Sequence, residues 1–318
     1  MPDAPRQALS ESAPADGQNP GTLRQPSGDW PAIEAARAHD AARRLTFRLL
    51  DQGRPVPVGS VARPHLPALA DWGHALQISD QAVTLCLPAA ERNAFFEAAN
   101  QRLRQAGLVR GWRDETYPVL AASGGGPLLA TFERAAARFW GTLTFGAHCN
   151  GYQTGPDGRP SHLWIARRAI NKAVDPGLLD NLIGGGVPWG QTPAAAVLRE
   201  GWEEAGLRPA QMQGLRAGRR FTVRRDVAEG LQHEQVSVYD LALPAGLQPC
   251  NQDGEVHSHT LMPVAQALAH AAAGDMTVDA SLATLDFALR RRLLPANAHQ
   301  HLRALSEGLW CGAALLDR

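Results

Sequence analysis

The chain has 318 residues, of which 44% are hydrophobic and 19% charged, a composition typical of globular proteins with one or two domains. Its 31 basic and 31 acidic residues balance, so composition gives no reason to expect a nucleic acid or an anionic membrane as partner. No apolar run is long enough to span a bilayer, and no basic segment followed by an apolar one marks a signal peptide. We therefore expect a cytoplasmic protein.

Cysteine and lysine usage is informative. Cys86, Cys149, Cys250 and Cys311 lie far apart, without the close pairs of a zinc site, so we expect reduced thiols. Lys172 is the only lysine, which indicates a coding bias towards arginine. A lysine that survives such a bias is a candidate for a role that arginine cannot fill, the alternative being an ordinary surface lysine.

The first part of the chain predicts a tail and a small domain. Residues 1–28 are rich in Pro, Ser, Gln, Gly and Asp and predict a disordered tail. Residues 29–143 predict an accessory α+β domain. Its expected elements are a helix at about 30–50, short strands and turns at 55–71, a strand at 82–87, a helix at 89–105, a strand at 112–120 and a helix at 128–140.

A second domain is expected over residues 144–278, followed by a helical extension over 279–318 that packs on it. Strands are predicted at 163–166, 179–183, 221–225 and 235–243. A helix begins after Thr192, a good N-cap, with Pro193 at its first position. Gly206 ends this helix as a C-cap glycine.

The helix after Thr192 carries three carboxylates, Glu200, Glu203 and Glu204, whose spacing places them on one face. Crowded carboxylates raise one another's pKa, and a hard divalent cation removes the repulsion between them. Oxygen ligands suit Mg²⁺, with Mn²⁺ as the alternative. A solvated acidic face is the competing interpretation. The residues expected to form the opposite, buried stripe are Val197, Leu198, Trp202 and Ala205.

The segment Gly185-x5-Gln191-x7-Arg199-Glu200-Gly201-Trp202-Glu203-Glu204-Ala205-Gly206 resembles the Nudix box. The resemblance implies a Nudix α/β/α sandwich, a mixed sheet between helices, here preceded by the smaller α+β domain. It implies that Glu200 and Glu203 are catalytic, with Arg199 orienting the carboxylates. It also implies a metal site made of Glu200, Glu203, Glu204 and the glycine loop, where Gly185 can bring a backbone carbonyl close.

Two positions depart from the box. Gln191 replaces a glutamate that pairs with the arginine in the family. We expect Gln191 to accept a hydrogen bond from Arg199, which leaves the site active but less well organised. Gly201 stands where an aliphatic residue is usual. It costs the helix up to about 1 kcal/mol against alanine and is expected to affect packing only.

The resemblance extends to the Nudix branch related to thiamin pyrophosphokinase, in which a domain of unknown function precedes the Nudix domain. It covers roughly residue 45 to the C-terminus. The branch implies hydrolysis of thiamine diphosphate, or of its damaged oxo and oxy forms, to the monophosphate. The segments that carry it are 111–119, 132–135, 146–152, 163–168, Lys172, 176–181, 184–186, 239–241 and 253–256.

Further site residues follow from the needs of a diphosphate. Cations besides the metal are required, and Arg167, Arg168 and Lys172 precede the box, Lys172 being the preferred phosphate contact. Glu255, just after a turn signal, is the candidate for a base or an extra metal ligand, and Glu234 is second. An organic ring needs apolar or aromatic walls, and the core is the favoured interpretation for each ring side chain taken singly. The candidates for such a wall are Trp164, Trp189, His148 and Tyr152.

Several alternatives stay open. An isopentenyl diphosphate isomerase needs a cysteine and histidines near the strand before the box, and residues 181–186 contain neither. The substrate could instead be ADP-ribose or a dinucleotide, or the chain could bind a diphosphate as a sensor without cleaving it. The N-terminal domain shows no catalytic constellation. It could wall the pocket or form a dimer contact, in a monomer or a homodimer. Arg113, Asp114 and Glu115 could have a functional role there, but a structural salt-bridge cluster is the favoured interpretation.

Overall fold

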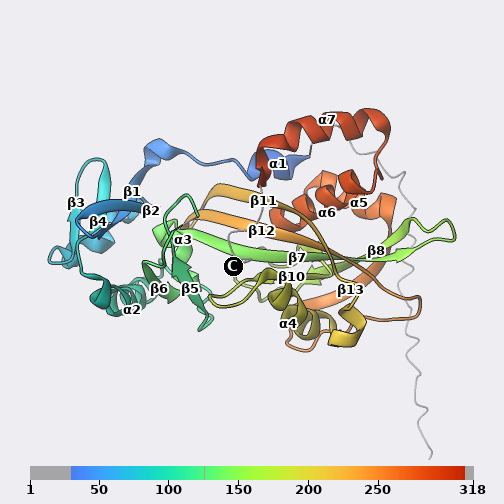
Figure 1. The fold of residues 1–318 in the computed structure, drawn as a ribbon, viewed down its shortest axis with the longest axis horizontal. Helices are drawn as coiled ribbons and strands as arrows, with labels where there is room; N and C mark the ends of the chain where they lie inside the picture. Colours follow the sequence, from blue (N-terminus) through green and yellow to red (C-terminus); the bar gives the residue numbers. More distant parts are fainter. Residues whose placement is uncertain (1–29, 125, 312–318) are drawn as a thin grey trace, which may run out of the picture.

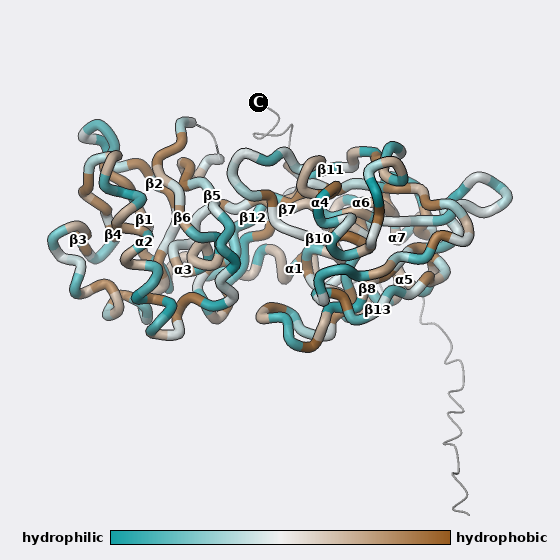
Figure 2. The backbone as a smooth tube through the Cα atoms, turned by 90° about the horizontal axis from the view of Figure 1, so that it is seen from below, coloured by the Kyte–Doolittle hydropathy of each residue, from teal (hydrophilic) through white to brown (hydrophobic). Residues whose placement is uncertain are grey.

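The computed structural model describes residues 30–124 and 126–311. It contains a small four-stranded sheet and a large eight-stranded sheet, which lie side by side along the long axis of the molecule (Figure 1; Figure 2), and a two-stranded sheet. The predicted tail at residues 1–28 and the end of the predicted helical extension at 312–318 lie outside the described residues. Within the described residues, no helix is long and apolar enough to cross a membrane.

The small sheet has the strand order β2-β1-β4-β3 and packs on helix α2. Strand β1 pairs antiparallel with β2 and parallel with β4. The predicted helix over 89–105 is confirmed, with the same bounds. The elements of this part are α1 (Pro31–Ala35), β1 (Arg44–Asp51), β2 (Arg54–Ala62), β3 (Leu76–Ile78), β4 (Ala82–Leu85), α2 (Ala89–Gln105), β5 (Thr116–Val119), β6 (Ala130–Glu133) and α3 (Ala137–Trp140).

Two predicted helices in this part were wrong. Residues 44–51 form β1, because Leu45, Phe47 and Leu49 alternate into the core of the small sheet. Residues 130–133 form β6, which pairs antiparallel with β5, and only α3 remains of the helix predicted over 128–140. The stretch predicted as short strands and turns over 55–71 is one long strand, β2, followed by a 3-10 helix over Arg63–Trp72.

The large sheet has the strand order β13-β8-β7-β12-β11-β14, with β7 and β12 parallel and the other pairs antiparallel. One face carries α4 and the other carries α1, α5 and α6, and a separate hydrophobic core fills each side. The predicted fold class, a mixed sheet between helices, is confirmed (Figure 1). The elements are β7 (Leu143–Thr154), β8 (Pro160–Arg168), β9 (Leu179–Asn181), β10 (Ile183–Gly186), α4 (Pro193–Ala205), β11 (Arg216–Val227), β12 (Gly230–Ala242), β13 (Val256–Pro263), α5 (Val264–Ala273), α6 (Val278–Arg290), α7 (Ala296–Ser306) and β14 (Trp310–Cys311).

The strand predicted over 179–183 divides into two. Strand β9 pairs with β8, whereas β10 crosses over to pair with β7, and Leu182 lies between them at the break. The Leu182 side chain is fully buried against Gly151 of β7, a position where a Cβ atom would collide with it. The crossing lays the glycine run of β10 along β7 and beneath α4.

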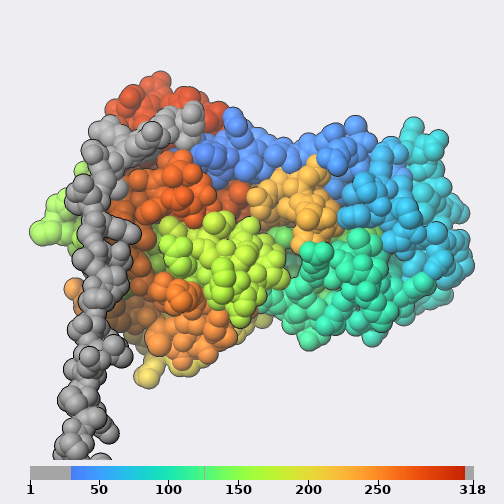
Figure 3. Space-filling model, turned by 180° about the vertical axis from the view of Figure 1, so that it is seen from behind, coloured from blue at the N-terminus to red at the C-terminus, as the bar shows by residue number. Residues whose placement is uncertain are grey.

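Helix α1 packs with the large sheet although it precedes the small one in the sequence. Trp30 and Ile33 are buried in the same core as α5 and α6, and the Trp30 indole donates a hydrogen bond to the Ser281 carbonyl at 3.3 Å. Figure 3 shows this segment, in blue, beside the C-terminal helices before the chain reaches the small sheet. The chain therefore enters the large unit, builds the small one and returns. We propose that the boundary between the two domains lies near residue 143, as predicted, and that α1 belongs to the large unit.

Candidate active site

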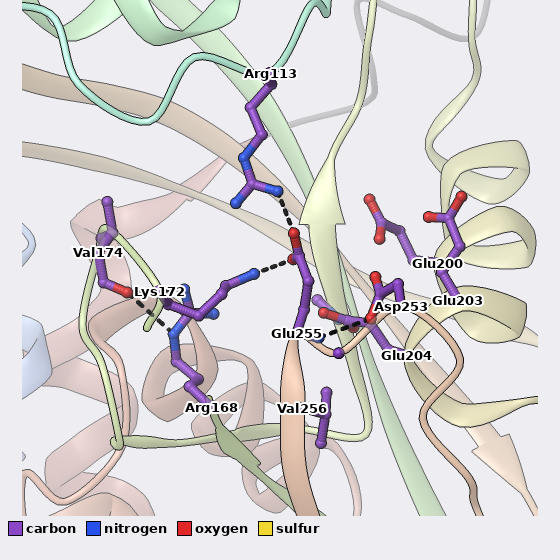
Figure 4. Close-up of polar contacts among 12 residues, drawn as sticks. Arg113, Arg168, Lys172, Val174, Glu200, Glu203, Glu204, Asp253, Glu255 and Val256 are labelled. Atoms are coloured by element: carbon purple, nitrogen blue, oxygen red, sulfur yellow. Dashed lines mark hydrogen bonds and ion pairs between the residues drawn. The ribbon is translucent and has the colours of Figure 1, made fainter. Parts of the chain in front are cut away.

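Helix α4 begins and ends as its sequence predicts. The Thr192 side chain accepts a hydrogen bond from the Ala195 amide at 3.2 Å, and Gly206 closes the helix in the left-handed region with φ 65°. Glu200 and Glu204 are only 8% and 5% exposed, whereas Glu203 lies at the rim. All three carboxylates project from the same side of α4 (Figure 4).

The predicted buried stripe of α4 was wrong at two positions. Val197 and Ala205 are buried, but Leu198 and Trp202 are 37% and 48% exposed. The buried side of α4 instead includes Glu200, Gly201 and Glu204. Gly201 permits this, because Met212 and Ile183 can approach the helix backbone there. A Cβ atom at Gly201 would lie 2.6 Å from Met212 Cε, which confirms that this glycine serves packing. Because the buried side of α4 differs from the predicted one in this way, Glu200 and Glu204 lie partly inside the protein.

Arg199 organises the carboxylates without Gln191. Its guanidinium donates to Glu200 Oε1 at 2.8 Å and to Glu203 Oε2 at 2.7 Å. A third, longer hydrogen bond reaches the Gly186 carbonyl at 3.4 Å. The expected hydrogen bond from Arg199 to Gln191 is not made, and Gln191 Oε1 is buried without a partner among the described residues. Arg199 already has three acceptors on its own helix and on β10, so the glutamine is not needed to hold it.

The glycine run of β10 gives the carboxylates room and a donor. A Cβ atom at Gly185 would lie 2.1 Å from Glu200 Oε1, so only glycine fits there. The Gly184 amide donates to Glu204 Oε2 at 2.8 Å. These contacts explain why a run of small residues precedes the acidic helix.

Burial makes two of the carboxylates costly to ionise. It raises the pKa of Glu200 to about 7, an effect that Arg199 partly offsets. Burial and the neighbouring Glu200 raise the pKa of Glu204 well above its usual range. A bound divalent cation would relieve this cost, and the all-oxygen donor set suits Mg²⁺ or Mn²⁺. Among the residues that the structure describes, no three acidic, imidazole or thiol groups already converge as a metal site, since Arg199 and Gly184 hold the oxygens.

A cavity of about 450 Å³ lies between the acidic side of α4 and a wall that carries both cationic and anionic side chains. Glu200, Glu203 and Gly185 line one side. The basic side chains of the lining come from both units of the chain. They are Arg110, Arg113, Arg134, Arg138, Arg168, Lys172 and Arg199.

Glu255 directly precedes β13 and is held by two of these cations. Its carboxylate is paired with the Lys172 ammonium and with the Arg113 guanidinium (Figure 4). Burial alone would raise the pKa of Glu255, but Lys172 and Arg113 outweigh it and lower the pKa below its ordinary value. Glu255 is therefore ionised at neutral pH but is a weak base while both cations hold it.

Of the other two predicted phosphate contacts, Arg168 lines the cavity and Arg167 does not. Arg168 lines the cavity, where it pairs with Asp180 at 2.9 Å and donates to the Val174 carbonyl. Arg167 is exposed and donates to the Gly177 carbonyl, and it is not among the residues that line the cavity. Of the two, only Arg168 is placed to face a ligand in the cavity.

The expected aromatic walls are mostly absent from the cavity. Trp164 and Tyr152 are buried in the two cores beside the large sheet, and Trp189 is exposed outside the cavity. His148 does line the cavity, with its Nδ1 atom 2.9 Å from Asn181 Oδ1. Among the described lining residues, His148 carries the only ring.

Sequence reasoning missed two parts of the lining. Gln232 donates to Glu234 at 3.0 Å and to Asp279 at 3.1 Å, which joins strand β12 to helix α6 at the cavity. Arg134 enters from the small unit, paired with Glu115 at 3.1 Å. Arg134 and Glu115 lie in segments that carry the family resemblance, and that was the only available signal. Asp279 had no such signal.

Two family models match different parts of the chain. Residues 150–280 match the family model described as NUDIX domain, and residues 35–144 match the one described as Domain of unknown function (DUF4743).

Two similar plant proteins are named Nudix hydrolases. The chain is 34% identical over 209 residues to "Nudix hydrolase 20, chloroplastic" of Arabidopsis thaliana, covering 63% of this chain and 53% of the relative. It is 35% identical over 201 residues to "Nudix hydrolase 24, chloroplastic" of the same plant, covering 60% and 52%. The chain thus spans about half the length of these curated relatives. A cytoplasmic location stays a prediction for this chain.

A solved structure, that of DR0079 from Deinococcus radiodurans, aligns with 54% of this chain and 99% of its own at 20% identity, with a TM-score of 0.41.

Proposed function

From the NUDIX domain that residues 150–280 carry behind a DUF4743 domain, we propose that the chain is a hydrolase that cleaves a diphosphate bond with the help of a divalent cation. One observation supports this most directly. The acidic side of α4 and the basic group around Lys172 face each other across one cavity. A metal-bound diphosphate has both signs of charge to satisfy, and such a cavity offers partners for both.

The proposed metal ligands are Glu200, Glu203, Glu204 and the carbonyl of Gly185, with Mg²⁺ or Mn²⁺ as the ion. When bound, the ion would neutralise charge on the phosphate oxygens and favour ionisation of a water molecule. Arg199 holds Glu200 and Glu203 in place for it.

The proposed chemistry is attack by water on phosphorus. The oxygen of water bonds to phosphorus, the bridging P–O bond breaks, and the leaving phosphate keeps the electron pair. Lys172 and Arg168 would stabilise the charge on the phosphate oxygens. Glu255 would take the proton of the water, with Glu234 as the second candidate.

For the substrate we propose thiamine diphosphate or its oxo and oxy analogues, cleaved to the monophosphate and phosphate. The resemblance to the branch related to thiamin pyrophosphokinase supports this choice. The cavity supports recognition of the diphosphate more than of a ring, because its described lining is charged and carries one imidazole. ADP-ribose and dinucleotides are the alternative substrates.

A screen of the purified chain with Mg²⁺ tests the proposal. Thiamine diphosphate, its oxo and oxy analogues, ADP-ribose, dinucleotides and isopentenyl diphosphate are supplied in turn, and released phosphate or monophosphate is measured. We expect fastest turnover of the thiamine analogues. Fastest turnover of ADP-ribose or a dinucleotide would replace the substrate but keep the chemistry. Binding without turnover of any compound would favour the sensor.

The variant Glu203→Gln tests the metal site. We expect it to lower kcat by about 10²-fold or more, because a proposed ligand loses its charge. The fold should remain, since Glu203 is half-exposed and its pair with Arg199 is worth only about 0.3–0.5 kcal/mol. Thermal melting checks this, and Glu91→Gln, on the exposed side of α2, is the matched control. Normal turnover by Glu203→Gln would place the metal site elsewhere.

A further inference from the structure

A loop of the small unit carries Arg113 into the cavity, and several contacts fix this loop. Both oxygens of Glu133 accept backbone hydrogen bonds from it, one from the Arg113 amide at 3.0 Å and one from the Glu115 amide at 3.1 Å. Asp114 has φ 58°, in the left-handed region that aspartate adopts more readily than most residues with a side chain. Its carboxylate accepts from the Trp112 indole at 2.8 Å, which helps to keep it there. The loop is thus tied to Glu133 of β6 by two backbone hydrogen bonds.

Arg104 contacts the loop through the Trp112 side chain. Its guanidinium stacks over the Trp112 ring, 4.7 Å from the ring centre. Trp112 is also packed against the core of the small unit. The position of Arg113 is therefore set by the folded small unit and not by its ion pair alone.

Arg113 and Lys172 converge on a single carboxylate from two different units of the chain. Glu255 contributes one negative charge between two positive ones (Figure 4). Within this group of three side chains, the two cations therefore outnumber the single carboxylate. The three side chains stay in reach of a ligand, since Arg113 is 35%, Glu255 27% and Lys172 10% exposed, and all three line the cavity.

A phosphate group fits this arrangement better than a carboxylate does. It offers more anionic oxygens, and a guanidinium and an ammonium can each bind a different one. A phosphate that binds both cations would displace the Glu255 carboxylate, which now occupies that position. Among the described residues, Arg113 and Lys172 have no other ion pair that would have to break.

We propose that Arg113 of the N-terminal unit and Lys172 together form a binding site for a substrate phosphate group, which Glu255 occupies until the substrate enters. The N-terminal unit would then be a working part of the active site. The ligand class rests on the proposed function, but the site itself rests on the convergence of the two cations. In the occupied site Glu255 would be released from both cations, which leaves its carboxylate free to accept a proton.

The test is a binding titration by calorimetry with methylenediphosphonate in Mg²⁺ buffer, since its P–C–P bridge cannot be hydrolysed. Arg113→Gln should weaken binding by about 10- to 100-fold, the effect of losing a charge-assisted hydrogen bond. Glu255→Gln should tighten binding, because the ligand no longer competes with a carboxylate. A general loss of structure would change both in the same direction, so the opposite signs distinguish the proposal from misfolding.

Arg102→Gln is the matched control. Arg102 belongs to the same unit and forms an exposed ion pair with Asp71, but it does not line the cavity. Binding to Arg102→Gln should equal that of the unaltered chain. Unchanged binding in Arg113→Gln, or weaker binding in Glu255→Gln, would overturn the proposal.

Turnover by the same proteins separates this proposal from the proposed function. If the unaltered chain cleaves no diphosphate but binding still depends on Arg113, the phosphate site stands and the hydrolase assignment fails. If the chain cleaves a diphosphate and Arg113→Gln leaves KM and binding unchanged, the assignment stands and the role of Arg113 is rejected.

Discussion

Lys172 shows why one residue type can be kept at a position in a chain that otherwise uses arginine. Its ammonium lies in a confined place, with the side chain 10% exposed, and it reaches Glu255 beside the Arg113 guanidinium. A second planar guanidinium there would have to share the same carboxylate with the first. A compact ammonium avoids this crowding.

Lys172→Arg should therefore lower kcat/KM for a diphosphate by about 10-fold, as expected from the loss of one charge-assisted hydrogen bond. Steady-state kinetics on the best substrate of the Mg²⁺ screen measure the effect. The equivalent exchange outside the cavity, Arg102→Lys, should change nothing. Equal kinetics for Lys172→Arg and the unaltered chain would mean that the lone lysine is incidental.

At the scale of elements, the sequence predicted α4 well, because local contacts define it. It predicted poorly those strands that depend on pairing with distant parts of the chain. Thr192, Pro193 and Gly206 define the ends of α4 through contacts within a few residues, so the sequence contains all that is needed. Strands β1 and β6 depend on partners elsewhere, and their residues taken alone resemble helices.

The residues of the candidate site show the same contrast between local and distant contacts. The carboxylates of α4 are predictable, because three of them share one helix face. Arg113 is not predictable as a cavity residue, since its partner Glu255 lies 142 residues away in the sequence. The burial of Glu200 and Glu204 was also missed, because it depends on how Met212 seats α4.

The close approach of β10 to α4 gives a prediction at this scale. In Gly185→Ala the added methyl group would occupy the position of the Glu200 carboxylate. We expect kcat/KM to fall by about 10²-fold through displacement of a proposed metal ligand, with a loss of about 1–3 kcal/mol in stability. Kinetics and chemical denaturation measure the two effects.

Gly214→Ala is the control, since its Cβ atom would have 3.9 Å to the nearest atom, Leu241 Cδ1. Activity in Gly185→Ala equal to that in Gly214→Ala would contradict the role of the close approach.

At the scale of the whole molecule, buried carboxyls should make stability depend on pH. Burial and the neighbouring Glu234 raise the pKa of Asp279 from 3.8 to about 6. Between these values the folded chain binds more protons at Asp279 than the unfolded chain. The free energy of unfolding therefore falls as the pH rises from about 4 to about 6, and the penalty is complete above this range.

Asp279→Asn removes this contribution. We expect the variant to gain about 1–3 kcal/mol relative to the unaltered chain between pH 4 and pH 7. Urea unfolding at several pH values gives the difference between the two curves, which cancels the contributions of Glu200 and Glu204. A difference that does not change with pH would show that folding leaves the pKa of Asp279 unshifted.

The placement of α1 bears on the order in which the molecule forms during synthesis. Residues 44–140 are complete, with the core of the small sheet, before α6 has been made. Trp30 must wait for Ser281, which follows 251 residues later. Until α5 and α6 have both been made, the apolar side of the first described helix lacks part of the core that buries it. The larger core therefore closes last, and a chain that stops short of α6 would leave this segment open to chaperones and proteases.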